Sequence, residues 1–459
     1  MATLLGLTQS NDLASHASLS ARRKVFYAFP NGSAPMTGLL SMADTDSTDK
    51  AEFGWYHKRD ESMRIILESP SGGDGPFYPE GATTYGGATT NTTNITLTDG
   101  VKYRAVTEAN GTNKLRVNHV VLFKDIPIGG DATTFADFYG VVTEIVTSSL
   151  FEFTLTNGAN QTVFNHGDAW TAGPGAAAEQ NRGISIVGSA NPEGSASTTG
   201  LWNTPELETN YTQIFKTPFS STGTSLQEGM IWSDTGHYKD KAWEAMRAHA
   251  KELEMAALFG KKTKSQVAHS GGTTYQRTMN GVLSFLREWD TSKGATLNSD
   301  ENKRVISAQG TLNYTQFEDY MGRLFTVTND KNFEKICFCG ANFLQTLNRV
   351  IDSKVDIRTT MLGDESFKFR VAEITTMHGT VYFHTHPLFT SNADFNDSAL
   401  FVDINNLKLR PLNNRDTHIQ ENIQANDVDY RKDQYMTEIG LENILPESHL
   451  FIGGVTAAA

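Results

Sequence analysis

The hydrophobic pattern of this chain is most regular between Lys239 and Gly260. Apolar side chains recur there at steps of three and four residues, which is the spacing of one face of an α-helix. Charged positions between them, Glu254 included, are expected in water. At 1.5 Å per residue the segment predicts a helix of roughly 30 Å. Its predicted buried face consists of Trp243, Met246, Ala250, Leu253 and Ala257.

Local signals predict where this helix, at about residues 240–260, begins and ends. Asp240 is expected to cap the start, because a carboxylate can accept hydrogen bonds from the free N–H groups of the first turn. Gly260 is expected to end the helix in the left-handed conformation. Taken alone, such a helix is more often an ordinary core element than a functional one, so the rest of the chain must decide its role.

The polar N-terminal part of the chain predicts an arm and a ribbon. Residues 1–52 show little periodicity, which predicts an extended arm with at most short helices that must lie on another surface. Residues 69–100 are rich in Gly, Thr and Asn. This composition predicts a ribbon that a neighbouring surface orders. The few large apolar residues available for that contact include Phe77, Tyr78 and Tyr85.

A β-rich module interrupts the ribbon. The runs KLRVNHVVLF, FYGVVTEIVTSS and LFEFTLTNGA are rich in Val, Ile, Phe and Thr and are separated by turn residues, which predicts several strands. Residues 191–205 return to the composition of the ribbon. We therefore interpret 53–205 as one extended loop with a module of about 112–188 inserted into it.

The C-terminal half predicts a mixture of helices and strands. Residues 206–289 hold a strand, the long helix, a loop at 265–274, and a short strand or helix at 275–289. Residues 290–395 predict two short amphipathic helices, the buried strand KICFCG and a hairpin that turns near His378. Residues 396–459 return to strands, the last of which should complete a sheet under the long helix.

Composition and charge narrow the classes of function. The chain has 459 residues and a net charge of −13, from 52 acidic and 39 basic residues. Such a chain repels phosphates and is a poor general binder of nucleic acid. No window reaches eighteen apolar residues, so no membrane span is predicted, and the first residues lack the pattern of a signal peptide.

Candidate chemistry is sparse. Cys337 and Cys339 are expected to be small buried hydrophobes of a reducing compartment, with a two-cysteine metal or redox site as the alternative. His384 and His386 are the candidate metal ligands, because alternate residues of a strand point to one side. A metal-dependent hydrolase using this pair is the enzymatic alternative. No common catalytic or cofactor motif occurs, so no catalytic residue and no cofactor are predicted.

Several phrases of the sequence resemble one family. They are NYTQIFKTPFSSTGTS before the long helix, AMRAHAKELEMAALFG within it, RTMNGVLSF after it, and a C-terminal phrase formed by Tyr435, Thr437, Glu438, Leu441 and Glu442. In this order they resemble the major capsid proteins of tailed bacteriophages, with the HK-ninety-seven-type fold, and most closely their podovirus-type group. The resemblance covers about residues 190–459, while residues 1–190 match in layout.

The resemblance implies an α+β capsid fold. Residues 1–52 would be the N-terminal arm, 53–205 the extended loop with its inserted module, and the long helix the spine helix. Residues 206–289 and 396–459 would form the peripheral domain, and 290–395 the axial domain. The residues expected to matter for assembly are Trp243, Met246, Leu253, Gly260, Phe77, Tyr78 and Tyr85.

The same resemblance implies a structural function. Copies of the chain would assemble as pentamers and hexamers into an icosahedral shell around double-stranded DNA, bound without sequence specificity. Portal, scaffolding and decoration proteins would be its partners, in the virion and, during assembly, in the host cytoplasm. The open alternative with the same fold is an encapsulin-like compartment that holds protein cargo.

Overall fold

The chain folds into two compact units in a computed structural model. The larger unit comprises Met1–Trp55 and Leu207–Ala459, and the β unit comprises Tyr56–Glu206. No helix among the residues described is long and apolar enough to cross a membrane. The structure describes residues 34–42, 46–58, 64–67, 76–80, 95–107, 110–128, 134–157, 161–163, 183–198, 200, 204–228, 237–269, 272–291, 303–307, 309–326, 334–351, 357–362, 369–413 and 415–456.

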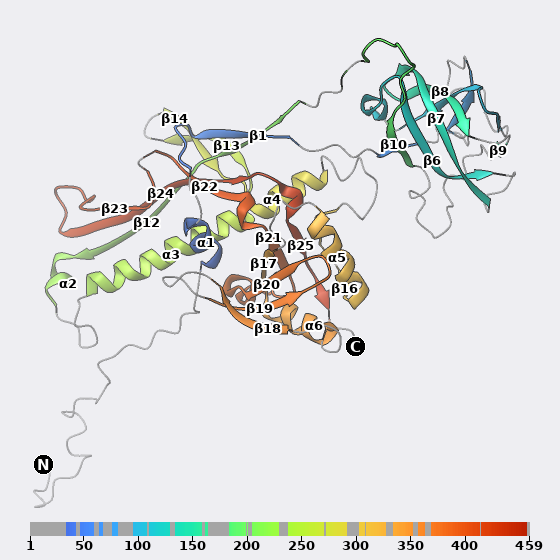
Figure 1. Cartoon of the computed structure of the whole chain (residues 1–459). Coiled ribbons are helices and arrows are strands. Elements are labelled where there is room, and N and C mark those ends of the chain that lie inside the picture. Colours follow the sequence, from blue (N-terminus) through green and yellow to red (C-terminus); the bar gives the residue numbers. More distant parts are fainter. Residues whose placement is uncertain are drawn as a thin grey trace, which may run out of the picture. The chain divides into compact units, whose positions relative to one another are not determined.

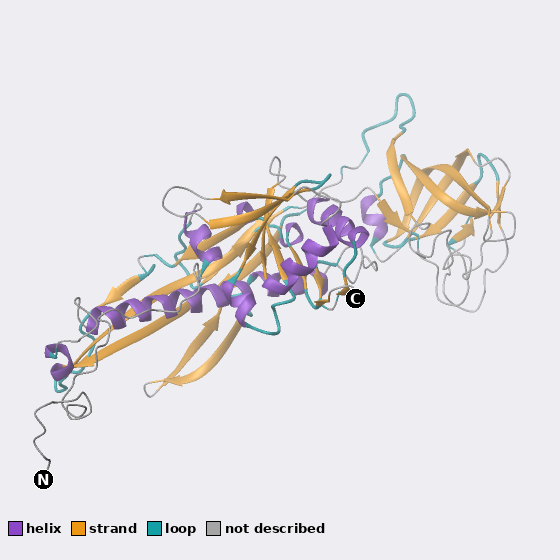
Figure 2. Cartoon of the chain, turned by 90° about the horizontal axis from the view of Figure 1, so that it is seen from below, coloured by secondary structure: helices purple, strands orange, loops and turns teal. Residues whose placement is uncertain are grey.

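The helices of the larger unit surround two sheets (Figures 1 and 2). They are α1 (Pro35–Met42), α2 (Gly223–Gln227), α3 (His237–Phe259), α4 (Val282–Trp289), α5 (Tyr314–Thr326), α6 (Ala341–Ile351), α7 (Pro387–Ser391) and the short 3-10 turns η6 (Ile404–Asn406) and η7 (Pro446–Ser448). The long helix α3 runs along β12 (Gln213–Thr222) and β24 (Tyr430–Asn443) (Figure 1). The late strand β24 thus completes the sheet under the long helix, as the sequence predicts.

That sheet has four strands. Its order is β12-β24-β22, with β22 at Leu407–Pro411, and β23 (His418–Gln420) also pairs with β24. The pairing of β12 with β24 is antiparallel and continuous from Gln213 opposite Ile439 to Thr222 opposite Tyr430. Residues more than 200 positions apart in the sequence therefore form the longest ladder of the unit.

The second sheet of the larger unit has seven strands. Its order is β15-β25-β21-β17-β20-β19-β18. The bounds are β15 (Val305–Ile306), β17 (Glu334–Cys339), β18 (Ile357–Leu362), β19 (Phe369–Thr375), β20 (Thr380–Thr385), β21 (Ala399–Val402) and β25 (Leu450–Ile452). Three two-stranded sheets complete the unit: β1 (Glu52–His57) with β11 (Glu206–Tyr211), β13 (Thr263–His269) with β14 (Gly272–Thr278), and β16 (Gly310–Thr311) with β26 (Val455–Thr456).

Two hydrophobic clusters of the larger unit contain residues of the seven-stranded sheet. In one, Leu324 of α5 and Leu347 of α6 pack with the buried Cys337 and Cys339. In the other, Leu258 of α3 packs with Phe338 and with residues of the four-stranded sheet. Cys337 and Cys339 are free thiols within the first cluster, so the prediction that they are small buried hydrophobes is confirmed.

The β unit is a single antiparallel sheet system. Its nine strands follow the order β2-β10-β6-β7-β8-β5-β3, with β9 paired to both β4 and β6. A short 3-10 turn, η1 (Gly111–Lys114), lies between β5 and β6. The strand bounds are β2 (Arg64–Ile66), β3 (Phe77–Pro79), β4 (Ile95–Leu97), β5 (Lys102–Val106), β6 (His119–Ile128), β7 (Thr134–Thr147), β8 (Leu150–Asn157), β9 (Gln161–Val163) and β10 (Gly183–Ser189).

The predicted limits of the β module, 112–188, are too narrow. Strands β2 to β5 lie before residue 112, yet β2 pairs with β10 and β5 pairs with β8. Phe77 and Tyr78 are buried, and Phe77 packs with Phe123 and Phe153 of the same unit. Part of the predicted ribbon is therefore part of this sheet, because its few apolar residues find partners in their own chain. Tyr85 lies outside the residues described.

Two further predictions need correction. The segment 265–274, predicted as a loop, contributes most of β13 and the start of β14, whose backbones pair from Ser265 opposite Gln276 to His269 opposite Gly272. The predicted buried face of α3 is also wrong in part, since Trp243 and Met246 are exposed. The residues of α3 that are buried are Ala245, His249, Glu254, Ala257 and Leu258.

Candidate functional site

The functional candidates in the larger unit are two buried polar clusters that join distant parts of the chain. We call the first the arm anchor, formed by Glu254 and His386 with the start of α1. We call the second the hub, formed by Lys335, Asp403, Asn406, Ser448 and His449. Buried polar groups are costly unless hydrogen-bonded, so their partners indicate what each cluster does.

The arm anchor holds the first described helix of the chain on the long helix. Glu254 is fully buried, and its carboxylate accepts the backbone N–H groups of Met36 at 2.9 Å and of Thr37 at 2.7 Å. These two residues lie in the first turn of α1, whose N–H groups have no partner within the helix. A carboxylate there satisfies both donors and interacts favourably with the helix dipole. Glu254 therefore caps α1 from another element.

His386 completes the arm anchor from the segment after β20. Its Nδ1 accepts the backbone N–H of Leu388 at 3.1 Å, so this nitrogen carries no proton. The proton is then on Nε2, which lies 2.7 Å from Oε1 of Glu254 and donates to it. One imidazole thus caps the short helix α7 and orients the carboxylate that caps α1.

The structure separates the two histidines that were the candidate metal ligands. His384 lies within β20, whereas His386 follows the strand and is the N-cap residue of α7. Both ring nitrogens of His386 are engaged, by Leu388 and by Glu254. In this arrangement neither ring nitrogen of His386 is available to a metal ion. Among the residues described, no group of three His, Cys, Asp or Glu side chains is placed to hold a metal ion.

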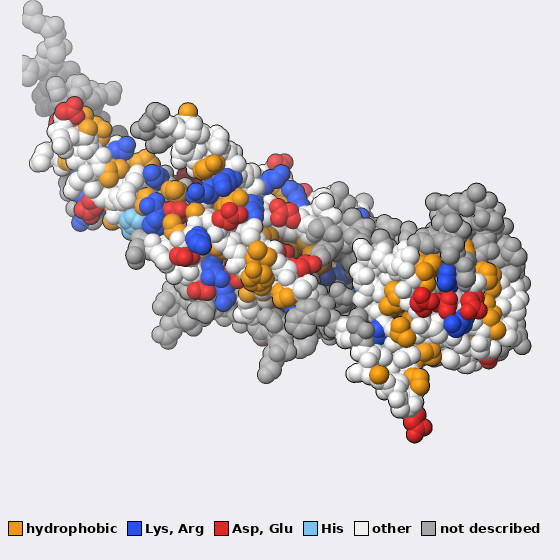
Figure 3. Space-filling model, turned by 90° about the horizontal axis from the view of Figure 1, so that it is seen from above, with side chains coloured by type: hydrophobic (Ala, Val, Ile, Leu, Met, Phe, Trp, Pro, Cys, Tyr) orange, Lys and Arg blue, Asp and Glu red, His pale blue; other side chains and the backbone are white. Residues whose placement is uncertain are grey.

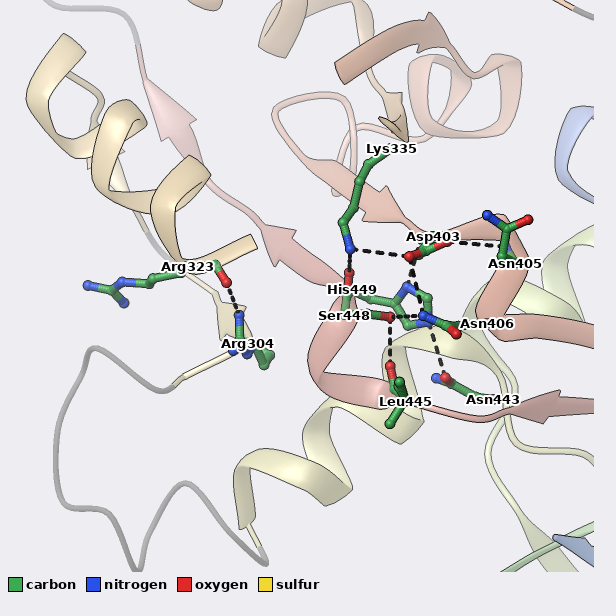
Figure 4. A network of polar contacts seen from close by, with 10 residues as sticks. All are labelled: Arg304, Arg323, Lys335, Asp403, Asn405, Asn406, Asn443, Leu445, Ser448 and His449. Atoms are coloured by element: carbon green, nitrogen blue, oxygen red, sulfur yellow. Dashed lines mark hydrogen bonds and ion pairs between the residues drawn. The ribbon is translucent and has the colours of Figure 1, made fainter. Parts of the chain in front are cut away.

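The hub joins the two sheets of the larger unit (Figure 4). Lys335 of β17 donates from Nζ to the backbone oxygen of Ser448 at 2.9 Å and contacts Asp403 at 3.4 Å. Asp403 in turn accepts from the side chain of Asn406 at 3.2 Å. Asn406 also donates to the hydroxyl of Ser448 at 3.0 Å. The network thus ties the seven-stranded sheet to the turns η6 and η7, which flank strands of the four-stranded sheet.

His449 belongs to the same network and is fully buried. Its Nδ1 accepts the backbone N–H of Asp403 at 3.0 Å, so Nε2 carries the proton and donates to Oδ1 of Asn443 at 3.1 Å. Burial lowers the pKa of His449 well below its usual range, and the charges of Lys335 and Arg304 add to this shift. His449 is therefore neutral in the folded protein at neutral pH.

The charged pair of the hub is fully buried. The side chains of Lys335 and Asp403 are 0% and 2% exposed. Burial lowers the pKa of Lys335, while the neighbouring Asp403 opposes that shift. A buried pair of this kind is weak evidence for net stability, but loss of one partner leaves an uncompensated charge. Removal of either partner should therefore destabilise the subunit, because the other charge would stay buried without its partner.

A third set of polar contacts fastens α3 to its sheet. His249 lies between Thr217 of β12, 2.9 Å from Nδ1, and Thr437 of β24, 2.7 Å from Nε2. Burial lowers the pKa of this histidine also. One neutral imidazole thus connects the helix to two neighbouring strands and fixes the position of the helix along them.

The C-terminal end of α3 is closed by backbone contact. The N–H of Gly260 donates to Ala256, and its carbonyl oxygen accepts from the N–H of Gly281. A Cβ atom at position 260 would lie 2.4 Å from the oxygen of Ala256 and 2.7 Å from that of Met279. Gly260 is not among the glycines with positive φ. The predicted left-handed end is therefore wrong, and the glycine is required by close packing.

The remaining residues predicted to matter for assembly differ in how far their side chains are exposed. Trp243 and Met246 lie on the outer side of α3, and Arg247 covers the ring of Trp243 at 4.7 Å. Leu253 is partly buried against the cluster between the sheets. Asp240 lies in the first turn of α3, which begins at His237, and not before it.

In Figure 3 the visible face of the larger unit carries many Lys and Arg side chains interspersed with acidic ones.

Sequence reasoning missed the functional role of Glu254, Lys335 and His449. Most of their partners lie far away in the sequence: Glu254 and Met36 are 218 residues apart, and Lys335 and Asp403 are 68 apart. The one local signal was position: Glu254 lies between Leu253 and Ala257 on α3, so a charged residue was next to the apolar face. Without the partner elements, that position is equally compatible with solvent.

Comparison with known proteins places this chain in a family. Residues 34–456 match the family described as SU10 major capsid protein. The major capsid protein of Pseudomonas phage PaMx41 is 22% identical over 270 residues, which is 58% of this chain and 60% of that protein. The chain thus matches less than two thirds of that curated relative.

Solved structures give a weaker likeness. The capsid of cyanophage A-1(L) has a TM-score of 0.39 at 13% identity, covering 59% of this chain and 85% of that one. An encapsulin complex of Synechococcus elongatus PCC 7942 has a TM-score of 0.36 at 7% identity, covering 57% of this chain and 80% of that one. Assignment therefore rests on the family match. Because that match spans 34–456 and includes both units, the chain belongs to the SU10 major capsid protein family.

Proposed function

We propose that this chain is the structural subunit of an icosahedral phage shell and carries no catalytic activity. The family match over residues 34–456 is the observation that carries the proposal. The polar clusters support a mechanical role, because each ring nitrogen of His386 and His449 is used to connect elements of the fold. These histidines hold helices and sheets together and have no nitrogen left for acid–base work on a substrate.

The parts of the fold suit such a subunit. In this proposal α3 is the spine helix, and the four-stranded sheet with 206–289 and 396–459 is the peripheral domain. Residues 290–395, with most of the seven-stranded sheet, are the axial domain that meets its copies at pentamer and hexamer centres. In this proposal the β unit takes the place of the extended loop, and its sheet includes strands of the segment before residue 112 that the sequence predicted as a ribbon.

The partners follow from the same proposal. The shell encloses double-stranded DNA without sequence-specific contacts, which suits a net charge of −13, since strong attraction would hinder packing and release of the genome. A portal and scaffolding or decoration proteins are the further partners. The subunit is made in the host cytoplasm and resides in the virion capsid.

Electron microscopy of the purified protein tests this function. Closed shells or rings of five and six subunits are expected, with nuclease-resistant DNA in shells purified from infected cells. Closed shells that hold protein cargo and no DNA would instead favour the encapsulin-like compartment. Only monomers, together with a hydrolytic activity lost on mutation of His384, would overturn the proposal.

A further inference from the structure

The β13–β14 hairpin is a two-stranded sheet with little support from its own chain. Seven residue pairs join the strands, from Thr263 opposite Thr278 to His269 opposite Gly272. No third strand pairs with it among the residues described. Most of its described side chains are exposed, with Val267 partly buried and residues 277–278 partly buried at the base. A lone hairpin of this kind is at best marginally stable in water, so a covering surface would stabilise it.

The charged residues of the hairpin and of the two residues before it are all basic. Residues 261–278 contain three lysines and one arginine and no acidic residue, in a chain whose net charge is −13. Lys262 is used internally, because its Nζ donates to the carbonyl oxygen of Thr209 at 2.6 Å. Lys261 and Lys264 are exposed, and Lys264 lies over the ring of Tyr275 at 4.8 Å. Tyr275 itself is 50% exposed, so the hairpin presents an aromatic ring flanked by cations.

A second segment of the chain has the opposite character. Residues 416–430 contain four acidic residues and neither Lys nor Arg. All four are exposed: Asp416, Glu421, Asp427 and Asp429. The same segment exposes four large apolar side chains, namely Ile419, Ile423, Val428 and Tyr430. Grouped exposed apolar residues with charges around them are typical of a protein interface.

This acidic segment also includes an open strand edge. Strand β23 pairs with β24, and its other edge has no partner among the strands described. An open edge presents N–H and C=O groups to which a further strand can be added. Among the residues described, no hydrogen bond or ion pair joins residues 261–278 to 416–430 of the same chain. Within the described part of the chain, the two complementary surfaces are thus not paired with each other by hydrogen bonds or ion pairs.

We propose that the β13–β14 hairpin of one subunit docks on residues 416–430 of a second copy of this chain. This inference rests on the proposed function as a shell subunit. The contact joins two different surfaces, so it is head-to-tail, and such contacts generate rings and closed assemblies when the rotation closes. Opposite charges steer the two surfaces together and fix their register, while Tyr275 supplies apolar area against the exposed Ile and Val side chains.

The packaged DNA is the other conceivable occupant of a basic hairpin. The acidic segment with its exposed apolar residues favours the second copy, because DNA offers no counterpart for them. DNA would be held by the lysine side chains alone, and this binding would weaken strongly as the salt concentration rises. The experiment below separates the two occupants.

A charge-swap series tests the contact on the full-length chain. Lys261→Glu with Lys264→Glu is expected to lower the shell yield more than about tenfold, because like charges then face one another across the interface. Adding Asp427→Lys and Asp429→Lys is expected to restore assembly. The matched control is Lys124→Glu with Lys239→Glu, which makes the same charge change at exposed lysines outside both segments and is expected to assemble normally. Shell yield is measured by sedimentation and microscopy, and subunit folding by circular dichroism.

A second measurement does not depend on variants. Shells are assembled from a mixture of isotope-labelled and unlabelled subunits and treated with a zero-length carbodiimide cross-linker. We expect cross-links between Lys264 of one subunit and Asp427 or Asp429 of another, seen as peptide pairs in which only one peptide is labelled. Absence of these cross-links, or failure of the swap to restore assembly, would overturn the proposal. Normal shells that retain less DNA in the lysine variant would assign the hairpin to DNA instead. If the unaltered chain forms no shells, the proposed function fails, whereas shells from every variant refute the docking alone.

Discussion

Glu254 and His386 are 132 residues apart in the sequence and 2.7 Å apart in the structure. The imidazole donates to a carboxylate that also accepts two backbone N–H groups from α1. One buried side chain of the long helix therefore holds the N-terminal arm on one side and the end of β20 on the other. This carboxylate acts together with the burial of Met36 and Leu40 of α1 in the hydrophobic cluster beside α3.

Glu254→Gln should loosen the arm. The amide keeps the shape of the side chain but has only one acceptor oxygen. Its NH2 group must therefore face a backbone N–H of α1 or the Nε2–H of His386, and neither can accept a hydrogen bond. We expect a loss of about 1–3 kcal/mol in the free energy of unfolding, typical of a hydrogen bond to a charged group. Urea denaturation measures this loss, and limited proteolysis near residue 34 detects release of α1.

Glu244→Gln is the matched control for this variant. Glu244 lies on the exposed side of the same helix, and we expect a change within about 0.5 kcal/mol. Equal effects of the two substitutions would show that the arm anchor contributes nothing specific.

Gly260→Val should destabilise the subunit and weaken assembly. Its Cβ would approach the backbone oxygens of Ala256 and Met279 to 2.4 and 2.7 Å, and backbone atoms cannot move aside as a flexible side chain can. Overpacking of this kind costs about 1–3 kcal/mol or more. Thermal unfolding and shell yield are the measurements. Gly200→Val is the control, because nothing lies within 4 Å of its Cβ position. Unchanged stability of the Gly260 variant would refute the packing argument.

The stability of the unassembled subunit should fall in acid because of His449. Burial holds its pKa in the folded state well below 6.5. Below pH 6.5 the unfolded chain therefore binds a proton that the folded protein excludes, so the free energy of unfolding decreases as the pH falls. The slope from one such histidine approaches about 1.4 kcal/mol per pH unit. It is measured by urea denaturation at several pH values between 7 and 5.

His449→Gln isolates this contribution. The glutamine cannot take up a proton, so the number of protons bound on unfolding below pH 6.5 should decrease by about one. The pH dependence that remains comes from His249, because burial lowers its pKa too. An unchanged slope in the variant would mean that His449 does not cause the acid sensitivity.

The β unit should be removable as a whole but not in part. Strands β1 and β11 pair beside the junctions, and His57 and Glu206 approach to 3.5 Å at their ends. Deletion of residues 59–204 with a short Gly/Ser bridge should therefore leave the larger unit folded and soluble. Circular dichroism and the thermal transition of the purified protein are the measurements.

Deletion of 112–188 alone provides the comparison. It removes β6 to β9 and most of β10, and so leaves β2 and β5 without their partners. Exposed unpaired strands with apolar faces promote aggregation, so insoluble protein is expected. If the variant lacking 112–188 is soluble and the variant lacking 59–204 is insoluble, strands β2 to β5 fold with the larger unit.

The sequence by itself determined the elements whose signal is local. The 3.6-residue period predicted α3 and the helices α5 and α6, and the β-rich phrases predicted β12, β17 and the late strand β24. The burial of Cys337 and Cys339 followed from their apolar run. Four different phrases, in their order along the chain, also indicated the capsid family, and the match over residues 34–456 confirms it.

Only the tertiary structure decided which side chains meet. Periodicity placed Trp243 and Met246 on an apolar stripe, but the sheet packs against a different face of α3, so these two are exposed and Glu254 is buried. A single sequence does not show where a helix will find its partner, because that depends on residues more than a hundred positions away. The same reason explains the β unit, whose first strands pair with its last. Gly260 was misjudged at shorter range, because its close contact with the backbone of Met279 is set by how the chain turns after the helix.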